Sequence, residues 1–221
     1  MLRIPPSVTD DEALLLGDIL STGFYCAEQG FSALPPLVRP GDSTCVVIGC
    51  GPVGLMAILG AREQCAGRIF AVDSIPGRLG LAEEFGAIPL RLGDDPVAVI
   101  KAATGLRGAD VVLEVVGQTS ALQLAYAMLR PAGVLFSVGV YTAPEFPFTP
   151  ANGYDKKITY RSGRCPARAM MERLLPMVEE RKYEFTRIVS QHARLEDCGE
   201  MYQIFDERKE GCTKVVFKPW D

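Results

Sequence analysis

Three glycines in the stretch TCVVIGCGPVGLMAILGA have the spacing G-x-G-x-x-G, which can hold a phosphate. They lie between Cys45–Ile48, an apolar run that predicts a strand buried on both faces, and Leu55–Ala61, which predicts a buried helix. We expect the first glycine to turn the chain, the second to leave room for a pyrophosphate, and the third to allow close helix–strand packing. The helix N-terminus would offer N–H groups to the phosphates. The predicted phosphate-binding residues are Gly49, Gly51, Pro52, Val53 and Gly54.

A single carboxylate accompanies the glycines at the distance that ribose binding requires. Asp73 lies 19 residues after Gly54, at the end of a second apolar run, Arg68–Val72. A carboxylate there can accept hydrogen bonds from both hydroxyls of an adenine ribose and would repel a 2′-phosphate, so NAD is favoured over NADP. Two other interpretations stay open: Asp73 caps the following helix, or the glycines form a turn in some other α/β protein.

Strand and helix patterns alternate around these residues. Helices are predicted between the strands, with Pro76 at one helix start and Asp94 or Asp95 before Pro96 at another. This alternation predicts an α/β fold of the Rossmann type, a doubly wound parallel sheet with right-handed crossovers. Beyond the second strand, the predicted strands are Ile88–Arg91, Ala109–Val116 and the run VLFSVGV that ends at Val140.

The flanking segments have weaker patterns. Thr9 or Asp10 would cap a helix through DDEALLLGDIL, and Ser21-Thr22-Gly23 interrupts its apolar pattern. The proline-rich segment APEFPFTPANGYD predicts a loop or sheet edge. The remaining predictions are a strand at Lys157–Arg161, a helix at Ala167–Glu180 that Pro176 would kink or end, a helix at Leu195–Arg208, and a strand at Lys214–Phe217.

Composition excludes several classes of protein. The chain has 221 residues, of which 48% are hydrophobic and 23% are charged, so it can bury a core. The net charge of −4 argues against a nucleic-acid partner. The sequence shows no secretory signal, and no apolar run reaches about 18 residues, so we expect no membrane span and a cytoplasmic location.

The cysteines and the histidine form no recognisable metal or disulfide pattern. The seven cysteines include no CxxC pair, so neither a disulfide framework nor a four-cysteine zinc site is expected. Several of them fall in predicted core positions. The one histidine, His192, lies in the polar stretch SQHARLED, which predicts a solvated loop residue.

Taken together, several stretches resemble the zinc-dependent, medium-chain alcohol dehydrogenases, in particular the alcohol and formaldehyde dehydrogenase-like branch. The stretches are LGDILSTGF, VVIGCGPVGLMA, FAVDSIPGRLGLAEEFGA, ADVVLEVVG, RPAGVLFSVGVY and GCTKVVFKP, and the resemblance extends from about Ile4 to Pro219. It implies a chain that lacks the GroES-like catalytic domain and the four-cysteine zinc lobe. The expected organisation is a lead-in helix and connector at 1–40, an NAD-binding Rossmann core at 41–155, and the end of the sheet with a C-terminal remnant of the catalytic domain at 156–221.

The resemblance also implies roles for individual residues. It assigns nicotinamide and ribose contacts to the backbone at two strand ends, with Thr22 near the nicotinamide. Arg78 would lie beside the adenosine ribose, or be a solvated helix residue, and Lys214 would reach the pyrophosphate, or be an ordinary strand-edge lysine. The residues at the two strand ends are Val116, Gly117, Val138, Gly139 and Val140.

Asp18, in LGDILSTGF, matches the position of the family's third catalytic zinc ligand. It could equally be an ordinary exposed helix residue. One carboxylate cannot hold zinc, so we expect no bound zinc in this chain alone and zinc only in a full-length relative.

The leading hypothesis is therefore the NAD-binding coenzyme domain of an oxidoreductase that transfers hydride between a small alcohol or aldehyde hydrate and NAD. The alternatives are a non-catalytic dinucleotide-binding module, a pseudoenzyme or one half of a split enzyme, and, less favoured, a zinc-independent reductase. We also expect a homodimer, joined through the fourth long strand and the PEFPFTP segment.

Overall fold

The structure is a computed structural model that describes residues 2–209 and 211–219. The chain forms two compact units. The first, here called the sheet unit, comprises Thr22–Pro166. The second, the terminal unit, combines the two ends of the chain, up to Ser21 and from Ala167 onward.

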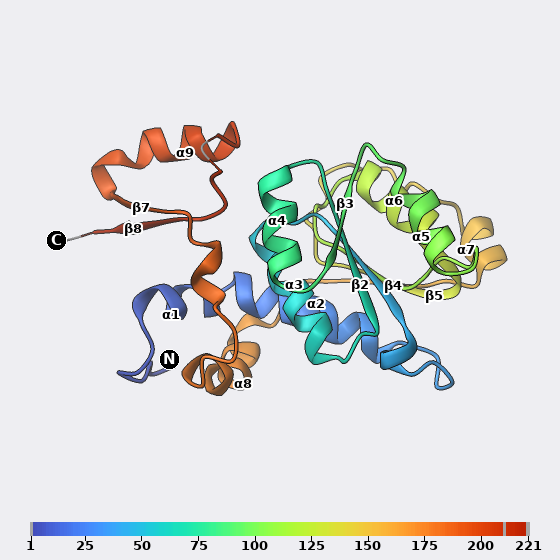
Figure 1. Ribbon diagram of the computed structural model, residues 1–221, viewed down its shortest axis with the longest axis horizontal. Helices are drawn as coiled ribbons and strands as arrows, with labels where there is room; N and C mark the ends of the chain where they lie inside the picture. The colour runs from blue at the N-terminus through green and yellow to red at the C-terminus, as the bar shows by residue number, and fades with distance from the viewer. Residues whose placement is uncertain (1, 210, 220–221) are drawn as a thin grey trace. The chain divides into compact units, whose positions relative to one another are not determined.

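The sheet unit is built on six parallel strands in the order β3-β2-β1-β4-β5-β6 (Figure 1, where colour follows residue number from light blue at β1 to orange at β6). Right-handed crossovers through helices are the usual way to connect parallel strands, and this order is that of a doubly wound sheet. The predicted fold class is therefore confirmed. The strands are β1 (Thr44–Ile48), β2 (Arg68–Asp73), β3 (Ile88–Arg91), β4 (Ala109–Glu114), β5 (Leu129–Ser137) and β6 (Thr159–Ser162).

Most helices of the sheet unit begin where the sequence has a proline or a capping residue. α3, α4, α5 and α7 each have a proline in their first turn, where no backbone N–H is needed. Asp95 caps α5 by accepting a hydrogen bond from the Ala98 N–H at 3.2 Å. The helices are α2 (Ile19–Ser32), α3 (Pro52–Glu63), α4 (Pro76–Glu84), α5 (Pro96–Ala103), α6 (Thr119–Met128) and α7 (Pro150–Lys156), with a 3₁₀ turn η1 at Pro40–Asp42.

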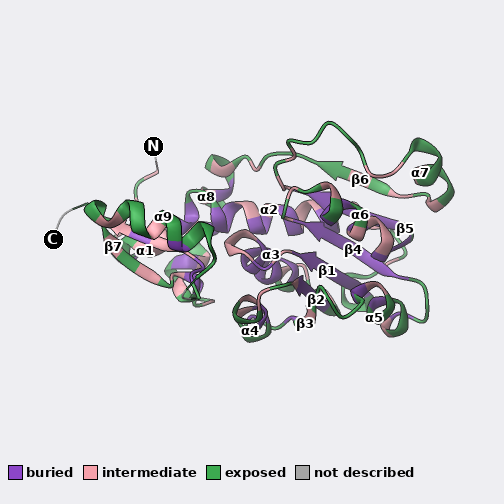
Figure 2. Cartoon of the chain, turned by 90° about the horizontal axis from the view of Figure 1, so that it is seen from above, coloured by how far each residue is buried: buried purple, intermediate pink, exposed green. Residues whose placement is uncertain are grey.

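Apolar side chains fill both faces of the sheet. On one face, Val46 and Val112 belong to a buried cluster with Leu122 and Met128 of α6. On the other face, Gly30 of α2 lies against Leu113 and Val111 of β4. Figure 2 shows β1, β4 and most of α3 as buried. Strands covered on both faces explain the continuous apolar runs in the sequence.

The predicted interruption at Ser21-Thr22-Gly23 is wrong, because α2 runs through it without a break. The glycine in this segment, Gly23, is needed because α2 packs closely against α3 there. A Cβ on Gly23 would lie 2.4 Å from the Cβ of Met56 in α3, and one on Gly60 of α3 would lie 2.9 Å from the Cβ of Ala27. The two helices cross at these glycines, and burial outweighs the low helix propensity of the segment.

The edge of the sheet also differs from the prediction. The fourth long strand, β5, is not an edge, because β6 pairs with it from Val134↔Thr159 to Ser137↔Ser162. The PEFPFTP segment adds aromatic packing beside β6. Phe146 lies edge-on to Tyr160, with ring centroids 5.2 Å apart, and Phe148 stacks on Tyr126 of α6 at 4.8 Å.

The terminal unit contains α1 (Asp10–Leu16), α8 (Ala167–Glu179), η2 (Phe185–Ile188), β7 (Gln191–Arg194), η3 (Leu195–Asp197), α9 (Cys198–Asp206) and β8 (Val215–Lys218). The strands β7 and β8 pair in parallel. The N-terminal segment is held by side chains from the C-terminal part. Ser7 Oγ donates to Glu179 at 3.2 Å, and His192 Nε2 lies 2.6 Å from Asp11 Oδ2.

Two predictions are only partly right in this unit. His192 is exposed, as predicted, but it lies in β7 and not in a loop, and its ring meets the carboxylate of Asp11 across 181 residues of sequence separation. Pro176, predicted to kink or end its helix, does not end it, since α8 continues to Glu179 with the proline on an exposed position. Its neighbours Leu174 and Val178 are buried, so packing of that face maintains the helix.

The boundaries of the units differ from the predicted limits of 1–40, 41–155 and 156–221. They fall at 21/22 and 166/167 instead, because α2 packs on the sheet and β6 extends it. Within the described residues, no helix is both long and apolar enough to cross a bilayer.

Candidate functional site

The loops that follow β1, β2, β4 and β5 come together at the carboxyl edge of the sheet. The Gly49 N–H donates to the Val72 carbonyl at 2.8 Å, and the Val115 N–H donates to the Ile48 carbonyl at 3.2 Å. The sheet order reverses direction between β1 and β4. Open α/β sheets bind ligands at such a reversal, outside the carboxyl ends of the strands.

Gly49 and Gly54 are required by the geometry of the loop itself. Gly49 has φ +94°, a conformation that glycine adopts without strain. A Cβ on Gly54 would lie 1.8 Å from the Gly49 carbonyl oxygen, so helix α3 and the end of β1 can approach only with glycine there. Both roles match those expected from the spacing.

Gly51 is different, because the chain does not fill the space beside it. It is the N-cap of α3 with φ −68°, and a Cβ there would meet nothing nearer than Arg78 Nη1, at 3.9 Å. Pro52 and Val53 form the first turn of the helix and are half-buried. A helix N-terminus beside an open space and a guanidinium group is a suitable place for a phosphate.

Asp73 is half-buried and anchors the glycine loop. Its Oδ2 accepts from the Cys50 N–H at 2.7 Å, and its Oδ1 accepts from the Ile75 N–H at 2.9 Å. Each carboxylate oxygen has a second acceptor position for a ligand hydroxyl. The hydrogen bond from the Ile75 N–H partly fits the alternative in which Asp73 caps the following helix. The N-cap residue of α4 is Ile75 itself, however, and not Asp73. Asp73 therefore fixes the loop and faces the same edge.

Arg78 of α4 lies near the glycine loop, with its Nη1 3.9 Å from the position of a Cβ on Gly51. Burial raises the pKa of the Cys50 thiol well above its usual value, and the Asp73 charge raises it further, whereas the Arg78 charge lowers it. Cys50 is fully buried, so it acts here as a small apolar side chain.

The strand ends of β4 and β5 pack backbone against backbone. A Cβ on Gly117, which has φ +81°, would lie 2.5 Å from the Val140 nitrogen. A Cβ on Gly139 would lie 2.2 Å from the Gly117 nitrogen. Val138 is half-buried, and the side chains of Val116 and Val140 are exposed at this edge, Val140 by 71%. These five residues, predicted from the two strand ends, therefore form one surface.

Glu114, the last residue of β4, belongs to this site but was missed by the sequence analysis. It is fully buried beneath the two loops and accepts hydrogen bonds from Val116, Gly117, Ser137 and Tyr141. The signal in the sequence was an acidic residue in the middle of the apolar run ADVVLEVV.

Three predicted residues belong to other elements than these loops. Thr22 is in α2 of the sheet unit and is half-buried. Asp18 is exposed in the turn between α1 and α2, and Lys214 is half-buried just before β8; both belong to the terminal unit. Within the sheet unit, the structure therefore brings together the glycine loop, Asp73, Arg78 and the strand-end residues.

The donor groups do not fit a zinc site. Across residues 2–209 and 211–219, no three His, Cys, Asp or Glu side chains come close enough together to hold a metal ion. Catalytic zinc sites need three protein ligands.

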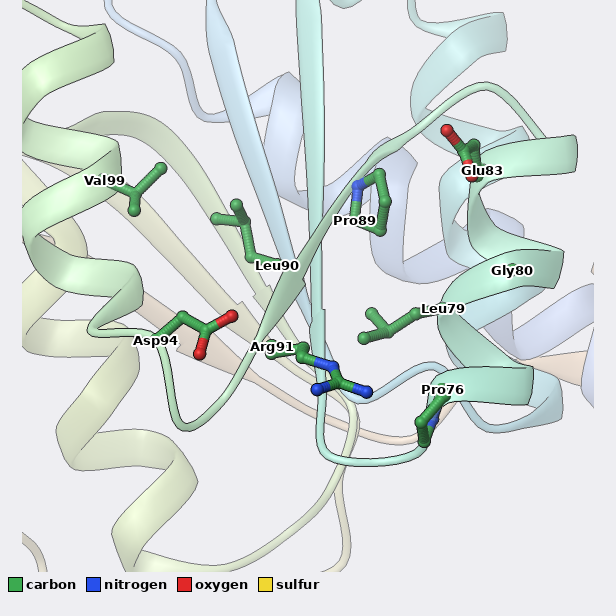
Figure 3. Close-up of a pocket in the computed structure, with 9 residues that line it drawn as sticks. All are labelled: Pro76, Leu79, Gly80, Glu83, Pro89, Leu90, Arg91, Asp94 and Val99. Atoms are coloured by element: carbon green, nitrogen blue, oxygen red, sulfur yellow. The ribbon is translucent and has the colours of Figure 1, made fainter.

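A separate hollow of about 430 Å³ lies at the outer edge of the sheet, between α4 and β3 (Figure 3). Pro76 and Leu79 of α4 face Pro89 and Arg91 of β3 across it. Arg91 pairs in register with Asp73, so the hollow adjoins the Asp73 side of the candidate site.

The chain matches the profile of the zinc-binding dehydrogenase family over residues 52–180, more than half of its length. It belongs to the zinc-binding dehydrogenase family. The resemblance seen in the sequence is thereby confirmed, and the matched region includes α3 and all of β2–β6.

Individual members of the zinc-binding dehydrogenase family align with nearly the whole chain. It is 35% identical to zinc-type alcohol dehydrogenase B of Aspergillus flavus, covering 99% of this chain and 51% of that protein. It is 34% identical to an alcohol dehydrogenase of Cupriavidus necator, covering 98% and 58%. The alcohol dehydrogenase TADH from Thermus sp. ATN1 superimposes with a TM-score of 0.88 at 38% identity, covering 97% and 60%. The chain thus spans about half to three fifths of the length of these relatives.

Proposed function

We propose that the sheet unit binds a nicotinamide dinucleotide, NAD in preference to NADP, as the coenzyme domain of an alcohol dehydrogenase-type oxidoreductase. The observation that carries the proposal is the open space beside Gly51 at the N-terminus of α3, with Asp73 at the end of the neighbouring strand. The family membership and the names of the relatives support the same reading.

The residues present fit the two halves of a dinucleotide. On the β1–β2 side, Gly51 and Arg78 would hold the pyrophosphate, and Asp73 would accept hydrogen bonds from the adenine ribose. On the β4–β5 side, the exposed surface formed by Val116, Gly117 and Val138–Val140 would hold the nicotinamide and its ribose.

NAD, when bound, supplies the hydride acceptor for oxidation of a small alcohol, or in reduced form the donor to an aldehyde. The chain's own contribution is to hold and orient that cofactor. The described residues offer no three-ligand zinc site.

This donor set favours a second candidate, a dinucleotide-binding module without its own catalysis. Asp18 is the only residue that matches the family's zinc-ligand pattern, and it is an exposed side chain in a turn. Metal analysis with an assay of NADH formation from short alcohols separates the two candidates. Stoichiometric zinc with steady turnover would reject the second one.

Calorimetric titration of the chain with NADH, NADPH and ADP tests the main proposal. We expect NADH and ADP to bind and NADPH to bind more weakly than NADH, because Asp73 would repel a 2′-phosphate. Absence of binding by all three ligands would reject the proposal. Tighter binding of NADPH would leave a dinucleotide site but reject the preference for NAD.

We further propose a cytoplasmic homodimer. Among the described residues no two cysteines are joined in a disulfide, which fits a reducing compartment.

The dimer would form along β6, the edge strand, where Phe146 is 52% exposed beside Tyr160. Light scattering at micromolar concentration should give twice the mass of one chain for the wild type. The Phe146→Glu variant should give the mass of a single chain. A monomeric wild-type chain would contradict this.

A further inference from the structure

Glu114 ends β4 with a side chain that has no exposure to solvent. Its Oε1 accepts from the Val116 N–H at 2.7 Å and from the Gly117 N–H at 2.8 Å. Its Oε2 accepts from Ser137 Oγ at 2.7 Å and from the Tyr141 hydroxyl. A buried carboxylate is stable only when such donors replace water, and here four donors do so.

The donors come from two different loops, so the carboxylate joins them. Val116 and Gly117 follow β4, whereas Ser137 ends β5 and Tyr141 lies four residues further on. The Glu114 carbonyl also accepts from the Val138 N–H at 3.1 Å. One residue therefore fixes the chain directly after both strands.

The close packing of the two loops depends on where this carboxylate lies. A Cβ on Gly139 would be 2.9 Å from Glu114 Oε2, and the same position is 2.2 Å from the Gly117 nitrogen. The carboxylate thus sits directly below the contact between the glycines. Removing it would leave the Val116 and Gly117 N–H groups without their acceptor and the loops without their common anchor.

Tyr141 contributes a hydroxyl that remains a donor. Burial raises the pKa of Tyr141, and its hydrogen bond to Glu114 raises it further, although the bond with Ser137 acts in the opposite direction. The hydroxyl therefore stays protonated at neutral pH. Ser137 Oγ also lies 3.1 Å from the Tyr141 oxygen, which closes the network.

We propose that Glu114 is a positioning residue for the nicotinamide half of the dinucleotide site, holding the loops after β4 and β5 as one binding surface. The inference rests on the proposed function. Glu114 itself does not reach the ligand side, because Val116, Gly117 and Gly139 lie between. It acts through the backbone that those residues present.

The same strand carries a matched control at its other end. Asp110 is also a buried carboxylate of β4, 2% exposed, and it accepts from the Thr44 N–H at 2.8 Å and from Arg130 Nε at 2.5 Å. It lies toward the amino ends of the strands, away from the candidate site. Replacing Asp110 should cost stability in a similar way without touching the ligand loops.

The experiment is calorimetric titration of the full chain and its variants with NADH and with ADP, which lacks the nicotinamide half. For Glu114→Ala we expect NADH affinity to fall about tenfold or more, with ADP affinity unchanged within about threefold, because several hydrogen bonds of the nicotinamide-side loops are lost. Asp110→Ala should leave both affinities close to those of the wild type.

Two conservative variants keep the test decisive if Glu114→Ala does not fold. In Glu114→Gln, the amide oxygen can still accept from the two backbone N–H groups, and the amide N–H₂ can donate to the Ser137 and Tyr141 oxygens. It should recover most of the NADH affinity. Tyr141→Phe removes a single donor, so it should weaken NADH by about threefold and leave ADP unaffected.

The outcomes separate the inference from the function on which it rests. If the wild-type chain binds neither ligand, the proposed function fails and the inference fails with it. If the wild type binds both, but Glu114→Ala and Tyr141→Phe weaken ADP as much as NADH or weaken neither, the proposed function stands and the role of Glu114 is overturned.

Discussion

At the scale of single residues, the glycines of one motif perform different physical tasks. Residue 54 has no room for a side chain, because a Cβ on Gly54 would lie 1.8 Å from the Gly49 carbonyl oxygen. Residue 51 has room, because the nearest atom to a Cβ on Gly51 would be Arg78 Nη1, at 3.9 Å. Gly54 is required for the packing of the fold, and Gly51 is proposed to leave room for the ligand. Substitutions at the two positions should therefore separate stability from binding.

Gly51→Ser should lose dinucleotide affinity while keeping its stability. Serine is a good N-cap residue, so the free energy of unfolding should change by no more than about 0.5 kcal/mol. Its side chain would occupy the space proposed for the pyrophosphate, so the affinities for NADH and ADP should both fall. Calorimetric titration and urea unfolding measure the two quantities.

Gly54→Ala is the matched control for that variant. Its Cβ would overlap the Gly49 carbonyl, so we expect a loss of at least about 2 kcal/mol in the free energy of unfolding. Equal effects of the two substitutions on stability would contradict the division of tasks.

Asp73→Ala should weaken NADH binding by about 1–3 kcal/mol, the range for hydrogen bonds to a charged group. Part of the loss would come from the glycine loop, because the Cys50 N–H would lose its acceptor. In the same variant the affinities for NADPH and NADH should differ less than in the wild type, since the repulsion of the 2′-phosphate is removed. An unchanged preference between the two cofactors would show that another residue sets it.

The sequence predicted the glycine loop and Asp73 because strand ends of a parallel sheet meet at one edge. Spacing and topology were enough to place those groups together. Glu114 could not be placed in the same way. Its role depends on hydrogen bonds from the Ser137 and Tyr141 hydroxyls, which lie 23 and 27 residues away in sequence. Only the folded structure shows that these hydroxyls reach the Glu114 carboxylate.

At the scale of elements, the crossing of α2 and α3 shows how packing overrides local pattern. Gly23 lies against Met56 and the backbone of Ala57, and Gly60 lies against Phe24 and Ala27. Small residues at the crossing allow the helix axes to approach. In the sequence alone, the same glycine and its polar neighbours read as a helix end.

Gly23→Ala should destabilise the chain, whereas Gly80→Ala should not. The Cβ on Gly23 would lie 2.7 Å from the Ala57 nitrogen, so we expect a loss of about 1–3 kcal/mol in the free energy of unfolding. Gly80 lies in α4 with nothing within 4 Å, so alanine there should stabilise by about 0.5–1 kcal/mol. Urea unfolding of both variants is the measurement. A neutral Gly23→Ala would contradict the close crossing.

The strands were the most predictable elements, since each of β1, β2 and β4 is buried on both faces and reads as an apolar run. The short strands β6, β7 and β8 depend on partners far away in sequence, and their limits were predicted only to within a residue or two, or not at all for β7. Their residues are largely half-buried or exposed, so the apolar pattern is weak.

At the scale of the whole molecule, buried thiols should make stability depend on pH. Burial raises the pKa values of Cys26, Cys45 and Cys50 in the folded chain, with smaller contributions from neighbouring acidic groups and, for Cys26, from Cys45. Above about pH 8.5 the unfolded chain loses these protons while the folded chain keeps them. The unfolded state then binds fewer protons, so stability should fall as pH rises.

The expected slope is up to about 1.4 kcal/mol per pH unit for each thiol above that pH. Urea unfolding under reducing conditions at pH 7, 8.5 and 9.5 measures it, and Cys45→Ala should give a shallower decline than the wild type. A free energy of unfolding that stays constant up to pH 9.5 would contradict the burial of these groups.

The association of the two chain ends could not be predicted from the sequence. Asp11 and His192 are 181 residues apart, and Ser7 and Glu179 are 172 residues apart, yet each pair is in hydrogen-bond contact in the terminal unit. Single-sequence patterns carry no signal for contacts of this range between exposed polar side chains. The family resemblance supplied the class of protein, but not these pairings.

We propose above all that a nicotinamide dinucleotide binds at the carboxyl edge of the sheet, across the loops after β1, β2, β4 and β5. Titration of the isotope-labelled chain with NADH, followed by NMR of the backbone amides, tests it most directly. We predict saturable shifts at Gly51, Gly54, Gly117 and Gly139, with Gly108, at the opposite end of β4, unaffected. Absence of saturable shifts at the four glycines, or shifts centred on Gly108, would contradict the account.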